Sequence, residues 1–569
     1  MILDLSRYSC LGEALRDPMV TFQTNVALIE ADRHRENGRW EFRELRAEAE
    51  RVAIRLQALG IKKGDRCAIL MSNQAKWVIS GIGALWAGCV LVPLDSRLTA
   101  AEQLALLRFA EPAVLITEYN AWRSLSREPP GVLTRQKVVV TEAPPGAELG
   151  AATRWEERVE GEFNFERRER NDIACVVFSS GTSGRPKGCL LTHDNYLEQA
   201  QMIGRLFPVE EGDRYFAILP NNHAVGFMGG MIIPLLFGAT VVHQRTLRPE
   251  FIASTMKAYR ITHTALVPRI LRNLEKRLRE KIDQLPGWKR LLLDGLMTAN
   301  ELATAREPNH KLSRILLKPI HRQLGDGLRL IIAGSAYVDP ECASFFYRLG
   351  IPVAIGYGLT EACTSLTLND LKPFRADTVG KPIPGIEIEI RDKNEGGIGE
   401  VYARARTVMK GYLNDSDLTR ETIIDGWLRT GDLALIDASG HLKLVGRAKN
   451  MIVTAGGKNV YPEDIESKFE SIATCEELCI CAASYIWPGA DLADETLVLI
   501  IRPKSDEPTA ELLDEIRTRN RELADYQRVS SYMVWKEEFP RSAKLDVKRQ
   551  QLAREIAVRL SRDKALRTL

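Results

Sequence analysis

The stretch VVFSSGTSGRPKG, residues 176–188, decides the fold and points to the chemistry. A run of apolar residues typical of a buried strand passes directly into a loop of hydroxyls and glycines that ends in Lys187. Glycine lets the backbone approach an anion and turn successive N–H groups toward it, and the hydroxyls and the lysine add donors and positive charge. The stretch is not a P-loop, because the lysine spacing differs and Pro186 stands where glycine is required. It therefore predicts a different kind of phosphate-binding loop at the end of a strand.

Strand and helix patterns alternate on both sides of this loop. The stretches that predict buried strands include RCAILM (66–71), CVLVPL (89–94), YFAILP (215–220), LRLIIAGS (328–335) and PVAIGYG (352–358). Residues 41–60 predict a helix, because their apolar side chains recur on one helical face and the pattern stops at Gly60. Such alternation predicts an α/β protein with parallel sheets covered by helices on both faces.

The pattern changes toward the C-terminus. After about residue 380, short strands joined by Gly, Asp and Asn predict a β-rich subdomain, and beyond residue 450 helical and strand patterns mix again. We therefore expect a large N-terminal body, residues 1–446, with two parallel-type βα sheets plus the β-rich subdomain. A small α+β C-terminal lid domain is expected to occupy residues 447–569.

The composition of the 569 residues is that of an ordinary folded protein, with 45% hydrophobic residues, 27% charged residues and a net charge of +3. It excludes a disordered or collagen-like chain and argues against a general nucleic-acid binder. The ten cysteines form no disulfide framework and are expected to be buried thiols, among them Cys475, Cys479 and Cys481. The uncharged stretches 77–94 and 224–242 contain glycines and a proline, so each predicts a buried helix and strand, not a membrane span. Since the N-terminus lacks a secretory signal pattern, we expect a soluble, cytoplasmic protein.

Five motifs, taken in order, resemble those of the adenylate-forming superfamily of acyl-CoA synthetases, luciferases and adenylation domains. They are SSGTSGRPKGCLLTHDN (179–195), GYGLTE (356–361), WLRTGD (427–432), GRAKN (446–450) and GGKNVYP (456–462). Asn450 replaces an aspartate that usually ends the fourth motif. The charged helical insert between Pro268 and Leu328 is similar to long-chain fatty acyl-CoA synthetases in particular.

The resemblance implies an AMP-forming acid–thiol ligase, in which ATP converts a carboxylic acid to acyl-AMP and coenzyme A then displaces AMP, with Mg²⁺ as cofactor. Residues 182–187 would hold pyrophosphate, Glu361 with Thr182 would bind Mg²⁺, and Asp432 would accept the ribose hydroxyls. Nucleotide contacts are expected from Ser179, Ser180, Gly181, Thr182, Ser183, Gly184, Lys187, Gly334, Ser335, Ala336, Gly356, Tyr357, Gly358, Leu359, Thr360, Asp432 and Arg447.

The resemblance also places the acid and the thiol. The acid pocket is expected at His223, Val225, Gly226, Phe227, Gly230, Ala333 and Tyr337, with glycines leaving room for an acyl chain. His223, Thr182, Glu361 and Lys544 are the expected catalytic residues, although a purely structural role for His223 stays open. Lys449 matches the hinge about which the lid turns, and Gly456, Gly457 and Lys458 would border the coenzyme A channel.

One departure from the family pattern affects the catalytic lysine. In PRSAKLDVKR, residues 540–549, ungapped alignment replaces the expected glycine by Leu545 and the expected lysine by Asp546. Either Lys544, which we favour, or Lys548 takes the place of that lysine; otherwise adenylation is slow, or the chain is a paralogue that binds nucleotide or acyl ligands without turnover.

Further alternatives concern partners. The acceptor could be a carrier-protein thiol in place of coenzyme A, and the sequence leaves the acid's chain length and the oligomeric state open. The basic C-terminal helix, residues 550–569, predicts either packing on its own domain or peripheral contact with an anionic membrane.

Overall fold

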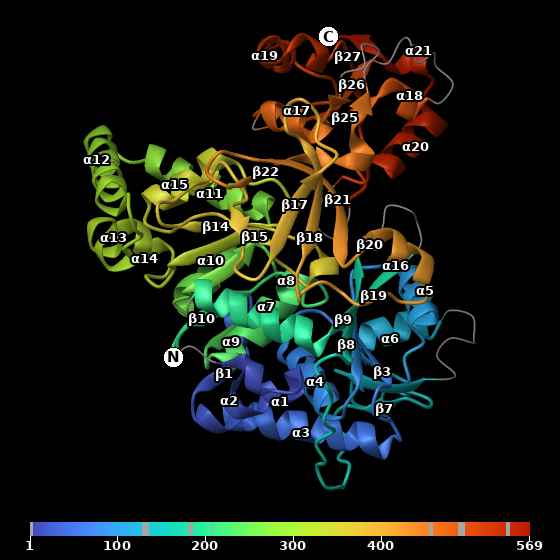
Figure 1. Ribbon diagram of the computed structural model, residues 1–569. Helices are drawn as coiled ribbons and strands as arrows, with labels where there is room; N and C mark the ends of the chain where they lie inside the picture. Colours follow the sequence, from blue (N-terminus) through green and yellow to red (C-terminus); the bar gives the residue numbers. More distant parts are fainter. Residues whose placement is uncertain are drawn as a thin grey trace. The chain divides into compact units, whose positions relative to one another are not determined.

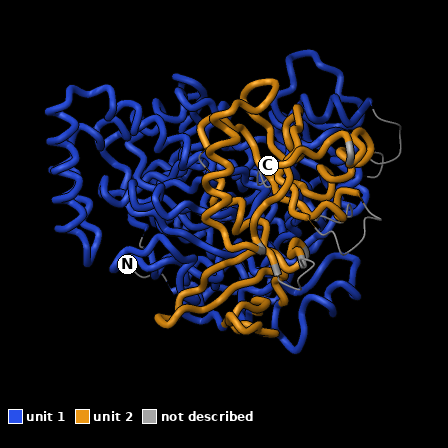
Figure 2. The backbone as a smooth tube through the Cα atoms, turned by 90° about the horizontal axis from the view of Figure 1, so that it is seen from above, with its two compact units in different colours: residues 1–181, 186–387, 403–428 blue, residues 182–185, 388–402, 429–569 orange. Residues whose placement is uncertain are grey.

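The computed structural model describes residues 4–127, 136–179, 186–207, 209–453, 459–470, 472–487, 496–541 and 547–569. The chain divides into two compact units, coloured separately in Figure 2. The larger unit comprises residues 1–181, 186–387 and 403–428, and residues 388–402 and 429–569 belong to the smaller one. The predicted boundary after residue 446 falls inside the smaller unit, so the extent of a lid domain stays a prediction.

Two sheets form the larger unit (Figure 1). The first has the strand order β16-β15-β14-β13-β12-β10-β11-β1-β2, and its six central strands from β14 to β1 are parallel. Its strands are β1 (Val26–Asp32), β2 (Arg35–Glu41), β10 (Arg214–Ala217), β11 (Thr240–Gln244), β12 (His263–Leu266), β13 (Leu330–Gly334), β14 (Val353–Tyr357), β15 (Thr367–Leu368) and β16 (Lys381–Pro382).

The second sheet has the order β19-β9-β8-β4-β3-β5-β6-β7 and a parallel core from β8 to β7. Its strands are β3 (Arg66–Leu70), β4 (Val90–Leu94), β5 (Val114–Glu118), β6 (Lys137–Thr141), β7 (Thr153–Arg154), β8 (Ile173–Ser179), β9 (Lys187–Thr192) and β19 (Gly411–Tyr412). The antiparallel strands β9 and β19 lie at one edge, where β9 returns directly after the glycine-rich loop.

Helices cover both faces of each sheet, as the alternation predicts. The main core lies between the sheets and is filled from α1 (Leu11–Ala14), α2 (Arg16–Thr21), α3 (Phe42–Ala58), α4 (Ala75–Trp86), α7 (His193–Leu206), α8 (Ala224–Phe227), the π-helix η2 (Met228–Ile232) and α9 (Ile233–Leu236). On the other face of the first sheet lie α10 (Pro249–Ala258), α11 (Pro268–Asp283), α12 (Gly287–Thr304), α13 (His310–Leu316), α14 (Lys318–Gln323) and α15 (Pro340–Arg348). On that of the second lie α5 (Ala100–Ala110) and α6 (Tyr119–Leu125).

The predicted helix at residues 41–60 illustrates why these elements form. In α3 the Glu44 side chain accepts the Glu41 N–H at 2.8 Å, which completes a capping box, and Leu45, Ala49 and Leu56 are fully buried on one face. Both uncharged stretches are buried helices followed by strands, α4–β4 and α8–β11, as predicted. In the part of the chain that the structure describes, the helices lack the length and apolarity that a membrane span needs.

The smaller unit contains most of a sheet formed by β17 (Glu387–Arg391), β18 (Gly399–Arg404), β20 (Ile423–Ile424), β21 (Trp427–Ile436) and β22 (Leu442–Arg447). Its other sheet has β25 (Cys475–Ala482), β26 (Leu497–Pro503), β27 (Ser531–Val534) and β28 (Arg567–Thr568). Helices α17 (Pro462–Phe469) and α19 (Ala510–Arg521) cover one face of that sheet, and α18 (Ala483–Ile486) and α20 (Arg549–Arg559) the other. Cys479 and Cys481 are buried on β25 and Cys475 is half-buried, so the predicted core thiols are confirmed. The predicted fold class is confirmed as well.

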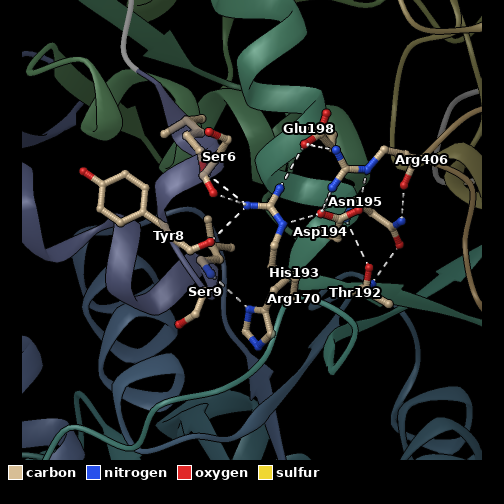
Figure 3. A network of polar contacts seen from close by, with 12 residues as sticks. Ser6, Tyr8, Ser9, Arg170, Thr192, His193, Asp194, Asn195, Glu198 and Arg406 are labelled. Atoms are coloured by element: carbon tan, nitrogen blue, oxygen red, sulfur yellow. Dashed lines mark hydrogen bonds and ion pairs between the residues drawn. The ribbon is translucent and has the colours of Figure 1, made fainter.

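A network of ion pairs fixes the segment before β8 to the start of α7 (Figure 3). The Arg170 guanidinium donates to Asp194 at 2.5 Å and to Glu198 at 2.9 Å, two carboxylates on the first turns of α7. It also donates to the carbonyls of Leu5 at 3.2 Å and Tyr8 at 3.0 Å. One side chain therefore ties the N-terminal segment to the helix that follows the glycine-rich hairpin.

Arg406 and the residues at the start of α7 add further contacts to this network. Arg406 pairs with Asp194 at 2.6 Å, and the Asn195 amide donates to the Arg406 carbonyl at 2.6 Å. Thr192 and Asn195 cap α7 reciprocally, and the buried His193 accepts the Leu11 N–H at Nδ1. These contacts tie the start of α7, directly after β9, to the N-terminal segment, to the segment before β8 and to Arg406.

Replacing Arg170 by alanine is expected to lower the free energy of unfolding by about 2–3 kcal/mol, because it leaves partly buried carboxylates and carbonyls without their donor. The measurement is the shift of the urea midpoint relative to wild type. Arg51→Ala is the matched control, since Arg51 is an exposed arginine paired with Glu48 at 2.8 Å and should contribute less than about 0.5 kcal/mol. Equal shifts in the two variants would contradict the assigned role of Arg170.

Candidate active site

The two ends of the glycine-rich loop meet at the edge of the second sheet. Ser179, the last residue of β8, pairs with Lys187, the first residue of β9, so the loop is closed by a hairpin. This places two of the predicted nucleotide-binding residues side by side. The predicted contacts Ser180, Gly181, Thr182, Ser183 and Gly184 lie outside the described residues.

The carboxyl ends of β13 and β14 bring the other predicted nucleotide-binding segments together. Gly334 pairs with Gly356, and a Cβ on Gly334 would lie only 2.6 Å from the Gly356 carbonyl oxygen. Ser335 adopts a left-handed conformation with φ 68°, which turns the chain away from the strand. Ser335, Ala336 and Tyr337 are exposed, so the strand end presents them to solvent.

A tight turn after β14 positions Glu361. Tyr357, Leu359 and Thr360 are largely buried, and a Cβ on Gly358 would lie 1.7 Å from the Thr364 carbonyl oxygen, so only glycine fits there. Cys363 has φ 70°, and the Thr364 N–H donates to the Ala362 carbonyl at 2.9 Å across it. The chain therefore doubles back directly after Glu361.

Tyr412 links Glu361 to Lys187. Its hydroxyl donates to Glu361 Oε1 at 2.9 Å, and the Lys187 ammonium lies 5.8 Å from the centre of its ring. Burial, together with the nearby Glu361 charge, raises the pKa of Tyr412 well above its usual value of 10, so the phenol remains a donor. A cation, a carboxylate and a fixed hydroxyl thus meet beside the mouth of the glycine-rich hairpin.

Tyr412→Phe is expected to lower the adenylation rate about tenfold, because Glu361 keeps its charge but loses the donor that orients it. The readout is ATP–pyrophosphate exchange as a function of Mg²⁺ concentration, in which the variant should need more Mg²⁺ for half-maximal rate. Tyr402→Phe is the control. Tyr402 lies on β18, and its ring packs under the guanidinium of Arg391 at the end of β17. An unchanged Mg²⁺ dependence in Tyr412→Phe would show that the hydroxyl does not position Glu361.

His223 belongs to a second polar cluster at the end of β4. Its Nε2 lies 4.0 Å from Asp95 Oδ2 and 3.4 Å from the Arg97 guanidinium. Asp95 and Arg97 form a bidentate pair at 2.9 and 2.7 Å. Burial opposes ionisation of Asp95, but hydrogen bonds from Arg97 outweigh it and lower the pKa of Asp95. His223 is thus held by a fixed charge pair.

A mainly apolar cavity adjoins the ends of β13 and β14. Its empty volume, including the open mouth, is about 1020 Å³. Its apolar wall includes Ile203, Phe207, Val225, Met228, Ile233, Leu266, Ile332 and Ala333. Ser335 and Tyr357 line one end, and Asp213 and His263 line the other. The lining follows β13 from Leu330 to Gly334, a length of about 13 Å at roughly 3.3 Å per residue.

The far end of the cavity is lined by two buried polar side chains, Asp213 and His263. Arg329 pairs with the buried Asp213 at 2.5 Å, and His263 Nδ1 contacts the Thr262 hydroxyl at 2.8 Å. Burial lowers the pKa of His263 to about 4, against the opposite effect of the Asp213 charge, so the imidazole is neutral at pH 7.

The predicted acid pocket only partly coincides with this cavity, to which it contributes Val225 and Ala333. Phe227 packs in the core against Trp77 and Tyr196. The glycines make close approaches within the protein: a Cβ on Gly226 would lie 2.0 Å from the Pro220 carbonyl oxygen, and one on Gly230 would lie 2.3 Å from the Asn221 side chain. The expectation that Gly226 and Gly230 leave room for an acyl chain is therefore wrong, because neighbouring protein atoms fill that room.

In the smaller unit the predicted ribose ligands pair with each other. Asp432 on β21 is buried and binds Arg447 on β22 at 2.6 Å, and its N–H donates to the Thr430 hydroxyl at 3.1 Å. The Asn450 amide donates to Glu463 at 2.5 Å, which explains why the aspartate of the family motif is absent: it would face a second carboxylate.

Of the residues predicted for the hinge and the coenzyme A channel, only Lys449 lies in the described part of the chain. The Lys449 backbone lies in a short 3₁₀ turn, residues 448–450. Gly456, Gly457, Lys458 and Lys544 lie outside the described residues.

Several site residues were missed from the sequence. Tyr412 reaches Glu361 because β19 pairs with β9, a contact between segments more than 200 residues apart that no local pattern reveals. Asp95 and Arg97 directly follow a predicted parallel strand, and polar residues at such strand ends gather at one edge. That rule could have found them.

The fold and the site together define a nucleotide-binding enzyme: a glycine-rich strand hairpin and a carboxylate lie beside an apolar pocket at the carboxyl ends of parallel strands. Comparison with known proteins agrees with this class. The family model described as AMP-binding enzyme matches residues 17–413, and the chain belongs to this family. The predicted superfamily is thereby confirmed.

Curated relatives and solved structures resemble the chain over most of its length. The long-chain-fatty-acid–CoA ligase heimdall of Drosophila melanogaster is 29% identical over 511 residues, covering 84% of this chain and 73% of the relative. The long-chain-fatty-acid–CoA ligase FadD15 of Mycobacterium bovis is 27% identical over 439 residues, covering 74% and 71%. The anthranilate CoA ligase AuaEII in complex with anthranoyl-AMP matches with a TM-score of 0.78 at 22% identity, covering 98% of each chain.

Proposed function

We propose that the protein is an ATP-dependent, AMP-forming acid–thiol ligase that converts a medium- or long-chain fatty acid to acyl-AMP and then to acyl-CoA. The observation that carries this proposal is the apolar cavity, which meets the predicted nucleotide-binding strand ends at Ser335 and Tyr357. A length of about 13 Å along β13 suits an extended chain better than a single ring. Two curated relatives named as long-chain-fatty-acid–CoA ligases support the same acid class and thiol.

The residues present fit a Mg²⁺ ion delivered with ATP. Among the described residues, no group of three or more His, Cys, Asp or Glu side chains is placed to hold a metal, so a self-sufficient protein site is not indicated there. Glu361 offers one carboxylate whose Oε1 is oriented by Tyr412. Mg²⁺ in nucleotide sites is typically bound by one or two carboxylates and the phosphates themselves. Bound in this way, the ion would offset the phosphate charge.

The chain's own groups account for the rest of the first step. Lys187 and the N–H groups of the hairpin would offset the negative charge of the departing pyrophosphate. The tightly packed turn from Gly356 to Glu361 would hold the α-phosphate and the acid carboxylate in the orientation that the reaction needs. The apolar cavity wall would exclude water from the acyl chain, so the mixed anhydride would be protected from hydrolysis.

The test is AMP release measured with a panel of fatty acids from six to eighteen carbons. Release that requires both a fatty acid and coenzyme A supports the proposal. Release that requires a phosphopantetheinylated carrier protein instead would identify the acceptor as a carrier thiol. Binding of ATP without AMP release or ATP–pyrophosphate exchange would identify a non-catalytic paralogue, the alternative that Asp546 raises.

Lys544→Ala is expected to slow ATP–pyrophosphate exchange about ten- to a hundredfold, while Lys548→Ala changes it less than about threefold. The flanks of this segment are fixed: Arg541 pairs with Glu477 at 2.5 Å, Arg541 bridges to Val547, and the Lys548 N–H donates to the Pro540 carbonyl at 2.7 Å. Lys548 thus starts from an anchored backbone, which opposes a shift of its side chain into the place of the expected lysine. Equal activity of wild type and both variants would exclude a substitute lysine.

A further inference from the structure

Helix α12 carries an apolar stripe on its solvent side. The side chains of Trp288, Leu291, Leu292 and Leu302 are 67%, 75%, 57% and 74% exposed. With Gly295 and Ala299 they recur at three- to four-residue spacing, so they lie on one face of the helix. A contiguous exposed stripe of this kind, unlike a single exposed leucine, indicates an interaction surface.

The stripe is not needed for the fold. The opposite face of α12 supplies the packing side chains, with Leu293, Met297, Asn300 and Thr304 buried. Figure 1 shows α12 on the outside of the helical layer, beyond α11 and α15. The neighbouring helix α13 adds another apolar side chain, Ile315, which is 74% exposed.

The helical insert that carries the stripe, residues 268–325, is strongly basic in sequence. Residues 268–325 contain 13 Lys and Arg against six Asp and Glu, a net charge of +7, whereas the whole chain has +3. Two of those acidic residues are paired with bases outside the insert, Glu301 with Arg348 and Glu307 with Lys372. Lys289 lies over the Trp288 ring at 5.4 Å, so cationic and apolar groups are interleaved at the stripe itself.

We propose that the α12 stripe and the basic side chains around it dock on an anionic lipid bilayer. A helix lying in the interface buries tryptophan and leucine at the level of the headgroups while lysine and arginine pair with anionic lipid, and this helix presents both. A second copy of the chain fits poorly, because an isologous contact would bring together two inserts that each carry a net charge of +7. This inference is independent of the proposed acid substrate.

The C-terminal helix, the other predicted membrane contact, is differently placed. Leu552 and Ile556 of α20 are fully buried against β25 and its neighbours, so the apolar face is already covered within its own domain. Packing on its own domain, one of the two predicted alternatives, is therefore what the structure has.

The test is co-sedimentation of the full chain with vesicles of phosphatidylcholine and phosphatidylglycerol (about 7:3) and with pure phosphatidylcholine vesicles. Trp288→Gln/Leu291→Gln/Leu292→Gln is expected to weaken binding to the anionic vesicles about tenfold or more. Lys289→Glu/Arg290→Glu/Lys311→Glu should weaken it similarly, and salt should weaken wild-type binding. The matched control, Val20→Gln/Leu247→Gln/Val558→Gln, replaces three exposed apolar side chains elsewhere, one of them on α20, and should stay within about twofold of wild type.

Three outcomes would overturn the inference. The first is wild-type protein that does not bind anionic vesicles, and the second is equal loss of binding in the stripe and control variants. The third is a wild-type dimer in sedimentation equilibrium that the stripe variant dissociates, which would assign the stripe to a second copy. Thermal unfolding midpoints should match wild type in all three variants, because every replaced side chain is exposed.

Discussion

ATP–pyrophosphate exchange is expected to fall about 10²–10³-fold when Glu361 is replaced by glutamine. Glutamine keeps the shape and can still accept the Tyr412 hydroxyl, so the turn that ends in Cys363 should persist. What is lost is the negative charge of the carboxylate that Tyr412 orients, which we assign to holding the cation that accompanies ATP. The loss should therefore appear in the rate and in the Mg²⁺ requirement, with the stability of the protein unchanged.

The control for this variant is Glu341→Gln, in the exposed first turn of α15, which should exchange at the wild-type rate. Thermal unfolding of both variants checks that the fold is intact. Exchange by Glu361→Gln at more than about a third of the wild-type rate would refute a role for this carboxylate in holding the cation.

Acidification from pH 6.5 to pH 5.0 is expected to remove about 5 kcal/mol from the free energy of unfolding of the larger unit. Burial lowers the pKa of His193 to about 3, of His243 to about 3 and of His263 to about 4, against an ordinary value of 6.5. The unfolded chain therefore takes up protons that the folded chain excludes. The stability is fully present above pH 6.5 and is lost progressively as the pH falls toward the folded pKa values, at about 1.5 kcal/mol for each histidine by pH 5.0.

Urea unfolding at pH 7.5, 6.0 and 5.0 measures this dependence, and His243→Leu separates it from other titrations. His243 is fully buried on β11, and both ring nitrogens lack a hydrogen-bond partner among the described residues, so leucine should reduce the pH dependence by about a third. His34→Gln is the control, because His34 is exposed and should leave the dependence unchanged. The same pH dependence in His243→Leu as in wild type would contradict the argument.

The spacing of apolar residues correctly predicted the helices and strands that bury one face or their whole length. Apolar spacing predicted three of these elements: helix α3, the α4–β4 pair and the strand β25 with its buried thiols. Each of them buries one face or a whole strand. The residues 228–232 were harder: they form a π-helix in which Gly229 makes room for the Tyr215 hydroxyl and Gly230 for Asn221. Glycine there reflects close packing within the protein, which a single sequence cannot distinguish from space left for a ligand.

The site was predictable where chemistry follows a strand end. Lys187 and Glu361 each adjoin a predicted strand, and in the structure both contact Tyr412, while their role at a phosphate site stays a prediction. The contact of Tyr412 with Glu361 depends on which strands become neighbours, a property of the whole topology. The Asn450 departure could be read only when its partner Glu463 was known.

Strand ends and helices contribute different parts of the cavity and its surroundings, and this difference matters for changing the acid that the protein binds. The predicted nucleotide-binding groups sit on strand ends and turns where an added methyl group would strike the backbone, as at Gly334 and Gly358. Much of the apolar wall instead comes from side chains of α7 and the α8–α9 segment, such as Ile203 and Met228. Substitutions of the helical side chains should therefore change which acid is bound without disturbing the predicted nucleotide-binding strand ends. A combinatorial library aimed at acid selectivity should vary the helical wall and keep the glycines of the turns.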